Sequence, residues 1–204
     1  MSNLVVLDYD AGNLRSVETA LTALGARFVV TRDPQVAAGA DRLIIPGVGD
    51  ARAAMAILNE TGLTGAINTV ADSGKPVLGI CLGSQIVLDR SEENDARCLG
   101  LIPGVARQFA PQPGIKIPHM GWNTIDRTAA HPLTAGIPSD ASFYFVHSFY
   151  PAPENARAIY AETEYGVRFA SIVGAGTVVA TQFHPEKSGA FGLRMLQNFL
   201  DWAP

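Results

Sequence analysis

A cysteine between two glycines is the residue of this chain best suited to act as a nucleophile. Residues 79–83 read Gly-Ile-Cys-Leu-Gly and follow an apolar run at 76–78. This pattern is typical of a nucleophile elbow, in which a strand ends in a tight turn that lifts one side chain before a helix leaves. Glycines suit the strained turn, and the start of the expected helix favours the thiolate of Cys81. The alternative is a buried structural cysteine, against which both flanking glycines argue.

A cysteine nucleophile needs a base, and the base needs a third group that fixes its tautomer. Residues 181–186 read Thr-Gln-Phe-His-Pro-Glu. In an extended segment, residues two apart point to the same side, so Glu186 can accept a hydrogen bond from His184. The alternative is that His184 and Pro185 simply end a strand. We predict a catalytic triad of Cys81, His184 and Glu186.

Acyl chemistry also requires an oxyanion hole. The backbone N–H of Leu82, directly after the nucleophile, is the expected first donor. Residues 46–49 read Pro-Gly-Val-Gly, and Val48 or Gly49 can supply the second donor, since the glycines let this loop turn its peptide groups toward the site or away from it. A plain strand-to-helix turn is the alternative for this loop.

Alternating elements in the first half must position these groups. We expect strands at 4–7, 28–30, 43–45 and 76–80, a helix from 14 to 24, one or two helices between 50 and 73, and a helix at 82–88. This order predicts a doubly wound, mostly parallel α/β sheet, in which ligands sit beyond the carboxyl ends of the strands. Because loop 46–49 and Cys81 both follow strands, we expect them to be neighbours.

The second half has a different character. Its candidate strands are separated by turns rich in Pro and Gly, which suggests an antiparallel addition to the sheet. These strands are 105–109, 143–149, 158–162, 169–173 and 177–183, and an amphipathic helix at 189–202 follows them. Without an internal repeat or linker, residues 1–204 are expected to form a single domain.

Composition limits the partners. A net charge of −4 and the lack of a basic run argue against binding to nucleic acid or to an anionic membrane. No apolar run approaches the roughly 18 residues that span a bilayer, and no signal peptide is expected. With only Cys81 and Cys98, of which the first is wanted as a free thiol, we expect a cytoplasmic protein.

Several segments together resemble a known family. Residues 79–83 with Gln85, and residues 182–186, resemble the class I, triad-type glutamine amidotransferases, which have a flavodoxin-like fold. Further segments are similar to the glutaminase subunits of imidazole glycerol phosphate synthases in that class. They are 8–17, 46–49, 118–123 (Pro-His-Met-Gly-Trp-Asn), 144–148 (Tyr-Phe-Val-His-Ser) and 184–188.

The resemblance implies that Cys81 attacks the side-chain amide of glutamine, releasing ammonia and then glutamate, in a step of histidine biosynthesis. It implies no cofactor and no metal. The glutamine contacts that it implies are Gly47, Gln85, Glu93 and Ser148.

The same resemblance implies a partner. In this family, ammonia passes to a (β/α)₈-barrel cyclase subunit, with which the glutaminase forms a heterodimer, and the cyclase makes imidazole glycerol phosphate and aminoimidazole carboxamide ribotide. The positions that match the family's interface are Asn13, Trp122, Tyr144 and Lys187. The departures from the common pattern are Ser84 for Met, Asp10 for Gly and Phe149 for Tyr.

Other interpretations remain open at this point. Glutaminases of pyridoxal phosphate, anthranilate or GMP synthesis share the triad but not the segment at 118–123. A non-catalytic subunit on the same fold and a stand-alone hydrolase or peptidase are further alternatives. His119 and His147 could be metal ligands with His184, although hydrogen-bonding roles are favoured, and Cys98 is expected to be inert.

Overall fold

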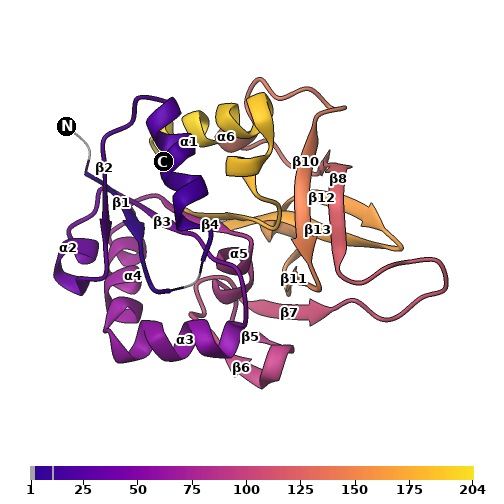
Figure 1. The fold of residues 1–204 in the computed structure, drawn as a ribbon, viewed down its shortest axis with the longest axis horizontal. Helices are drawn as coiled ribbons and strands as arrows, with labels where there is room; N and C mark the ends of the chain where they lie inside the picture. The colour runs from indigo at the N-terminus through magenta and orange to yellow at the C-terminus, as the bar shows by residue number, and fades with distance from the viewer. Residues whose placement is uncertain (1–2, 11) are drawn as a thin grey trace.

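The computed structural model describes residues 3–10 and 12–204, and a mixed sheet runs through its centre (Figure 1). From one edge to the other its strands are β2 (Phe28–Thr31), β1 (Leu4–Leu7), β3 (Arg42–Ile45), β4 (Val77–Ile80), β14 (Val178–Thr181), β13 (Val167–Ala175), β12 (Ile159–Tyr165) and β9 (Asp126–Arg127). Strands β2 to β14 in this order are parallel, and β13, β12 and β9 are antiparallel. The order of the parallel strands is that of a flavodoxin-like fold.

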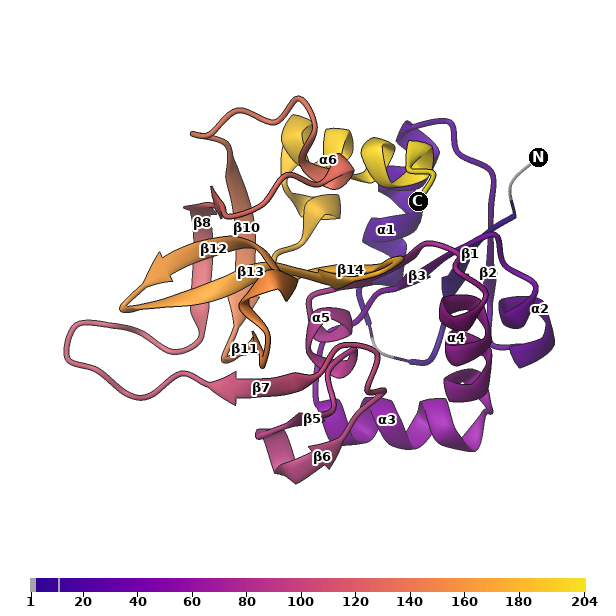
Figure 2. The same cartoon turned by 180° about the vertical axis from the view of Figure 1, so that it is seen from behind.

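Helices cover both faces of the parallel part (Figures 1 and 2). Because side chains alternate along a strand, Leu4 and Val6 of β1 pack in one core and Val5 and Leu7 in the other. The first core contains residues of α1 and α6, the second those of α3 and α4. The helices are α1 (Leu14–Ala23), α2 (Pro34–Ala38), α3 (Ala51–Glu60), α4 (Leu63–Asp72), α5 (Leu82–Ile86) and α6 (Gly189–Asp201).

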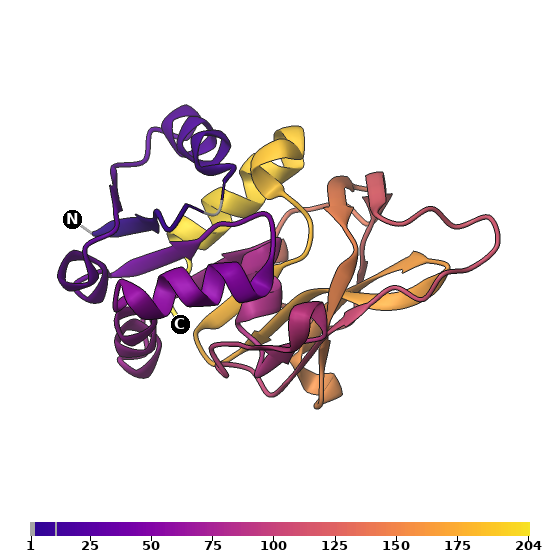
Figure 3. The same cartoon turned by 60° about the horizontal axis from the view of Figure 1, so that its bottom comes forward.

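The remaining strands gather on one side of the α/β half, as Figure 3 shows by their magenta and orange colours. One small sheet has the order β11-β7-β5-β6, and β10 pairs with β8. Their bounds are β5 (Arg90–Ser91), β6 (Ala96–Arg97), β7 (Gly104–Gln108), β8 (His119–Thr124), β10 (Ser142–His147) and β11 (Phe149–Pro153). Short 3₁₀ turns lie at Glu93–Asp95, Pro132–Thr134, Ala156–Ala158 and Pro185–Lys187.

The predicted α/β class with an antiparallel addition is confirmed, but some elements differ. The strand expected at 177–183 is β14, which pairs parallel with β4 in the middle of the sheet, so its assignment to the antiparallel addition was wrong. Its residues are all buried, as is typical of a central parallel strand. Helix α2 and strand β8 were not predicted, and the segment 143–149 is divided at Ser148.

In the part of the chain that the structure describes, the helices are too short or too polar to cross a membrane.

Candidate active site

The turn between β4 and α5 forces Cys81 into a strained backbone conformation. Its φ is 54° and its ψ is −102°, and its N–H donates to the carbonyl of Thr181 at 2.8 Å. A Cβ on Gly83 would lie 2.2 Å from the carbonyl oxygen of Ile45, and one on Gly79 would lie 2.7 Å from that of Gly83. Strand and helix therefore approach so closely that both positions require glycine.

Helix α5 is shorter than the helix expected at 82–88, since it ends at Ile86. Cys81 is its N-cap. A helix of little more than one turn aligns few peptide dipoles, so its end carries less positive potential than a long helix would provide. Hydrogen-bond donors to the sulfur of Cys81 must therefore be sought among the neighbouring side chains.

Two of the predicted triad residues form a buried pair directly after β14. The Nδ1 atom of His184 lies 2.7 Å from Oε1 of Glu186, and neither side chain is exposed to solvent. Glu186 belongs to the 3₁₀ turn Pro185–Lys187, so this turn makes the contact and the extended segment that we expected is absent. The carboxylate holds the Nδ1–H tautomer, which leaves Nε2 to exchange a proton.

The ring of His184 is set up to carry a proton. Burial by itself would lower its pKa, but the nearby Cys81 thiolate and the Glu186 carboxylate raise it to about 10. Its Nε2 atom is buried and has no hydrogen-bond partner among the described residues. An imidazolium with a free N–H beside a thiolate is the form that can protonate a leaving group.

Asn13, predicted at a partner interface, lies against His184 and Glu186 of the predicted triad. It has a left-handed backbone with φ of 61°, and its side-chain amide donates to Oε1 of Glu186 and lies 3.2 Å from Nδ1 of His184. Next to it, a Cβ on Gly12 would lie 2.8 Å from a methyl group of Val48. The loop between β1 and α1 thus touches both the triad and the predicted oxyanion loop.

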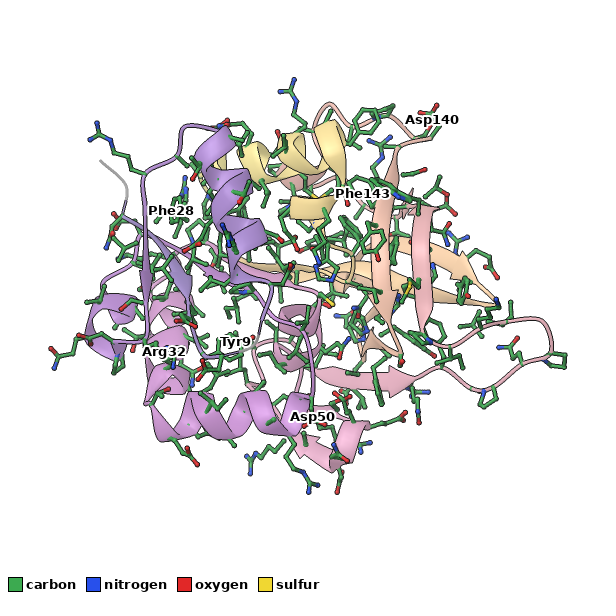
Figure 4. The ribbon with its side chains drawn as sticks, viewed as in Figure 1. Tyr9, Phe28, Arg32, Asp50, Asp140 and Phe143 are labelled. Carbon is green, nitrogen blue, oxygen red and sulfur yellow. The ribbon has the colours of Figure 1, made fainter. Side chains whose placement is uncertain are left out.

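The predicted oxyanion donors do not converge in this conformation. The N–H of Leu82 donates to the carbonyl of Gly47 at 3.1 Å. In a trans peptide the carbonyl and the next N–H point in opposite directions, so the N–H of Val48 points away from Leu82. A half-turn of the Gly47–Val48 peptide would free the N–H of Leu82 and point the N–H of Val48 toward the site. Tyr9, labelled in Figure 4, holds this loop through a 2.6 Å hydrogen bond to Pro46 O and was missed by sequence reasoning.

A cavity of about 290 Å³ opens beside Cys81. The predicted substrate contacts Gln85, Glu93 and Ser148 line it, together with Val48 and Gly49, whereas Gly47 faces the elbow. Its further lining residues are Leu82, Pro118, Val146, His147 and Phe149.

Some polar groups of the cavity already form hydrogen bonds within the protein. Gln85 uses its Nε2 hydrogens on the carbonyl of Phe149 and on Oε1 of Gln182, both at 3.1 Å, so it offers a ligand only its oxygen. Oε2 of Glu93 accepts from the N–H of Ala51 at 2.8 Å. Burial raises the pKa of Glu93, and the Ala51 hydrogen bond opposes this shift. The cavity therefore presents acceptors, which suit an ammonium group.

Of the remaining predicted interface residues, Tyr144 and Lys187 lie next to the predicted triad, and Trp122 packs on Tyr144. Trp122 is 59% exposed and packs edge-on against Tyr144, with ring centroids 6.1 Å apart. The backbone carbonyl of Tyr144 accepts from the N–H of His184 at 2.9 Å, and Lys187 is exposed. Met120, at 62% exposed, extends this apolar patch.

Two departures from the family pattern have a local explanation. Asp10, where Gly is frequent, pairs with Arg32, which also binds Asp8, so the added charge is compensated at the end of β1. Figure 4 labels Arg32 at this edge of the sheet. Ser84, where Met is usual, is fully buried and donates to the carbonyl of Cys81 at 2.7 Å.

The histidines considered as metal ligands are engaged elsewhere. Nδ1 of His119 lies 2.9 Å from Nε2 of His147, and Nδ1 of His147 lies 2.7 Å from the carbonyl of Phe149. Within residues 3–10 and 12–204, no group of three or more His, Cys, Asp or Glu side chains could hold a metal ion.

Comparison with known proteins places this geometry in a family. The profile of the glutamine amidotransferase class-I family matches residues 5–202. The chain is 45% identical to the imidazole glycerol phosphate synthase subunit HisH of Aromatoleum aromaticum, with 100% of both chains covered. It is 50% identical to that of Nitratidesulfovibrio vulgaris, over 96% of this chain and 94% of the relative.

Among solved structures, PurLQS from Thermotoga maritima is similar with a TM-score of 0.76 and 21% identity, over 98% of this chain and 99% of that one, which supports the fold. A fold shared at low identity does not by itself fix an activity. The full-length sequence matches do more, and the chain belongs to the class I glutamine amidotransferases, within the family of HisH subunits of imidazole glycerol phosphate synthases.

Proposed function

We propose that this chain hydrolyses glutamine to glutamate and ammonia at Cys81, and that the ammonia serves the cyclase subunit of an imidazole glycerol phosphate synthase. The observation that carries the proposal is the buried His184–Glu186 pair beside the elbow cysteine, at a cavity lined by acceptors. The names of the relatives support the synthase, since they are subunits of that enzyme.

In the first half-reaction, Sγ of Cys81 adds to the side-chain amide carbon of glutamine, and the negative charge moves to the amide oxygen. The oxyanion then collapses and the C–N bond breaks. His184 gives its Nε2 proton to the leaving nitrogen, which departs as ammonia, and a γ-glutamyl thioester remains.

In the second half-reaction, His184 takes a proton from water while the water oxygen adds to the thioester carbon. The C–S bond breaks, which releases glutamate and restores the thiolate. Glu186 keeps His184 in one tautomer and stabilises its charged form without transferring a proton itself.

Substrate recognition follows from the free acceptors of the cavity. The oxygen of Gln85 and the carboxylate of Glu93 bind the α-ammonium group, because both N–H groups of Gln85 are already used. Ser148, between β10 and β11, supplies its hydroxyl to the α-carboxylate.

Partner binding gates the reaction. In the isolated chain, the hydrogen bond from Leu82 to Gly47 occupies an oxyanion donor, so a half-turn of the Gly47–Val48 peptide must precede fast turnover. The exposed surface of Met120, Trp122 and Lys187, next to the triad, is the docking site for a (β/α)₈-barrel cyclase in a heterodimer. The free thiols Cys81 and Cys98 are consistent with a cytoplasmic setting.

The test is glutamate release by the purified chain, alone and with the cyclase subunit and its nucleotide substrate. We expect very slow glutamate release by the chain alone and release about 10² to 10³-fold faster in the complex. This is the factor by which the loss of one oxyanion-hole donor lowers kcat. Fast release alone that the cyclase does not change would contradict the gating and the synthase assignment.

The Cys81→Ala complex is the matched control. It should lose the synthase reaction with glutamine and keep it with added ammonium salt, because the cyclase chemistry lies in the other subunit. Loss of both reactions would contradict this division of labour.

A further inference from the structure

A buried amide side chain lies directly behind the nucleophile. Gln182 follows β14, is fully buried, and its Nε2 atom lies 3.8 Å from Sγ of Cys81. A sulfur acceptor takes longer hydrogen bonds than oxygen, because its atom is larger. Gln182 thus presents an N–H to the reacting atom from the protein interior, on the end of β14 that also leads to His184.

The orientation of this amide is fixed by a chain of partners that begins at a backbone carbonyl. The oxygen of Phe149 can only accept, so the atom of Gln85 that faces it is Nε2. The second hydrogen of the same Nε2 points to Gln182, 3.1 Å away, so the atom it meets there is the oxygen Oε1. The other end of the Gln182 amide, with its N–H groups, therefore faces Cys81.

The surroundings of Cys81 contain both an acceptor and a donor for sulfur. The carbonyl of Val146 lies 3.9 Å from Sγ and can accept only from the thiol form. The N–H of Gln182 can donate to sulfur and gives its strongest hydrogen bond when sulfur is charged. The short helix α5 adds little dipole, so a fixed neutral donor matters more here than at the start of a long helix.

The titratable groups around Cys81 are few. His184 is the cation beside it, and Tyr9 has its hydroxyl bound to a carbonyl, with a pKa raised by burial and by the charge of Cys81. His147 and Glu93 line the cavity. Unlike these side chains, the amide of Gln182 does not titrate, so it can donate a hydrogen bond to the sulfur at every pH.

We propose that Gln182 is a catalytic residue, whose side-chain N–H donates to Sγ of Cys81 in the thiolate. The same hydrogen bond stabilises sulfur again when it leaves the thioester carbon during hydrolysis. Gln85 is a positioning residue that holds the amide of Gln182 in its orientation. The inference rests on the proposed role of Cys81 as nucleophile.

The experiment measures the alkylation of Cys81 by iodoacetamide in the purified full chain across neutral and alkaline pH, with each cysteine followed by peptide mass spectrometry. Gln182→Met should slow alkylation about tenfold at neutral pH and move the profile to higher pH, since it removes a hydrogen bond to a charged group. Gln182→Glu should slow it more, because a carboxylate would then face the sulfur.

Two controls separate this effect from a general disturbance. Cys98, whose pKa burial and nearby carboxylates raise to about 12, provides an internal reference that should not change. Gln197→Met is the matched substitution on α6, where the side chain of Gln197 donates to the carboxylate of Asp201, and it should leave Cys81 unaffected.

A wild-type alkylation rate and pH profile in folded Gln182→Met would overturn the proposal. If that variant does not fold, a wild-type alkylation rate and pH profile in Gln182→Glu would overturn the proposal. This variant keeps the shape of the side chain and an oxygen for Gln85. Iodoacetamide needs no glutamine pocket, so a failed glutaminase assay and a failed alkylation test remain distinguishable.

Discussion

Among the described residues, two buried side-chain pairs contain histidine, and the pKa of histidine is shifted in opposite directions in the two pairs. In the His184–Glu186 pair, burial alone would lower the pKa of His184, but Cys81 and then the Glu186 carboxylate raise it to about 10. In the His119–His147 pair, burial dominates and lowers the pKa to about 4 for His119 and about 3 for His147. The charge of the neighbours, more than the depth of burial, decides whether a buried imidazole carries a proton.

The neutral pair has its tautomers fixed by its partners. His147 must donate from Nδ1 to the carbonyl of Phe149, so its Nε2 accepts from Nδ1 of His119. His119 is also stacked on Tyr165, with ring centroids 3.9 Å apart, and on Phe145 at 4.8 Å. This pair anchors the β10–β11 junction, where Ser148 lines the cavity, and we infer that its role is structural.

The largest expected effect separates the two pairs directly. His184→Ala should lower glutamine turnover in the synthase complex by about 10⁴-fold, since the proton shuttle is lost. His119→Gln, in the structural pair, should lower it less than about tenfold. Steady-state glutamate release measures both, and equal losses would contradict the division between a reacting and a structural pair.

The loss of glutamine turnover in Glu186→Ala should be roughly a hundredfold smaller than in His184→Ala. Glu186 orients the base and stabilises its charged form, but it does not transfer the proton. The activity optimum should also move to lower pH in the variant, as the raised pKa of His184 falls when the carboxylate is removed. A pH profile of turnover measures this shift, and an unshifted profile would show that Cys81 alone sets the charge of His184.

A smaller effect is expected at Asn13, which donates to Glu186 from the β1–α1 loop. Asn13→Gly keeps the left-handed backbone accessible and removes only the amide, so turnover in the complex should fall about tenfold. Asn13→Ala adds backbone strain as a comparison. If Asn13→Gly leaves the turnover of the isolated chain unchanged but abolishes its activation by the cyclase, the residue serves the interface and not the triad.

The smallest effect concerns stability, and its sign differs between the pairs. His119 and His147 have lowered pKa values, so their contribution to stability is present above pH 6.5. It is lost as pH falls toward 4 for His119 and toward 3 for His147, on the order of 2 kcal/mol per histidine at pH 5. His184 has a raised pKa, so its contribution is full below pH 6.5 and is lost as pH rises to about 10.

Unfolding free energies measured by urea denaturation across this range test both signs. His119→Gln should flatten the acid side of the stability curve and His184→Gln the alkaline side. The same flattening on both sides from either variant would contradict the assignment.

Much of the parallel half could be predicted from sequence, because local patterns dictate it. The apolar strands β1, β3 and β4 read as continuous runs, and the periodicity of α1 and α6 defines their buried faces. Strand β14 was found but placed in the wrong part of the sheet, since a strand's own residues do not say which neighbour it pairs with. Strand β8, which includes Gly121, and the short helix α2 lacked a clear period.

At the site, the sequence by itself determined what depends on short-range sterics. Cys81 sits on a turn that requires glycine at 79, where a Cβ would meet the carbonyl of Gly83, and His184 lies within two residues of the carboxylate that it meets. Tertiary structure alone decided the rest. The amide of Gln182 behind Cys81, Asn13 on Glu186, and the carbonyl of Gly47 on the Leu82 N–H join residues distant in the chain. Such contacts depend on how the strands are ordered and how loops close over their ends, which no local pattern encodes.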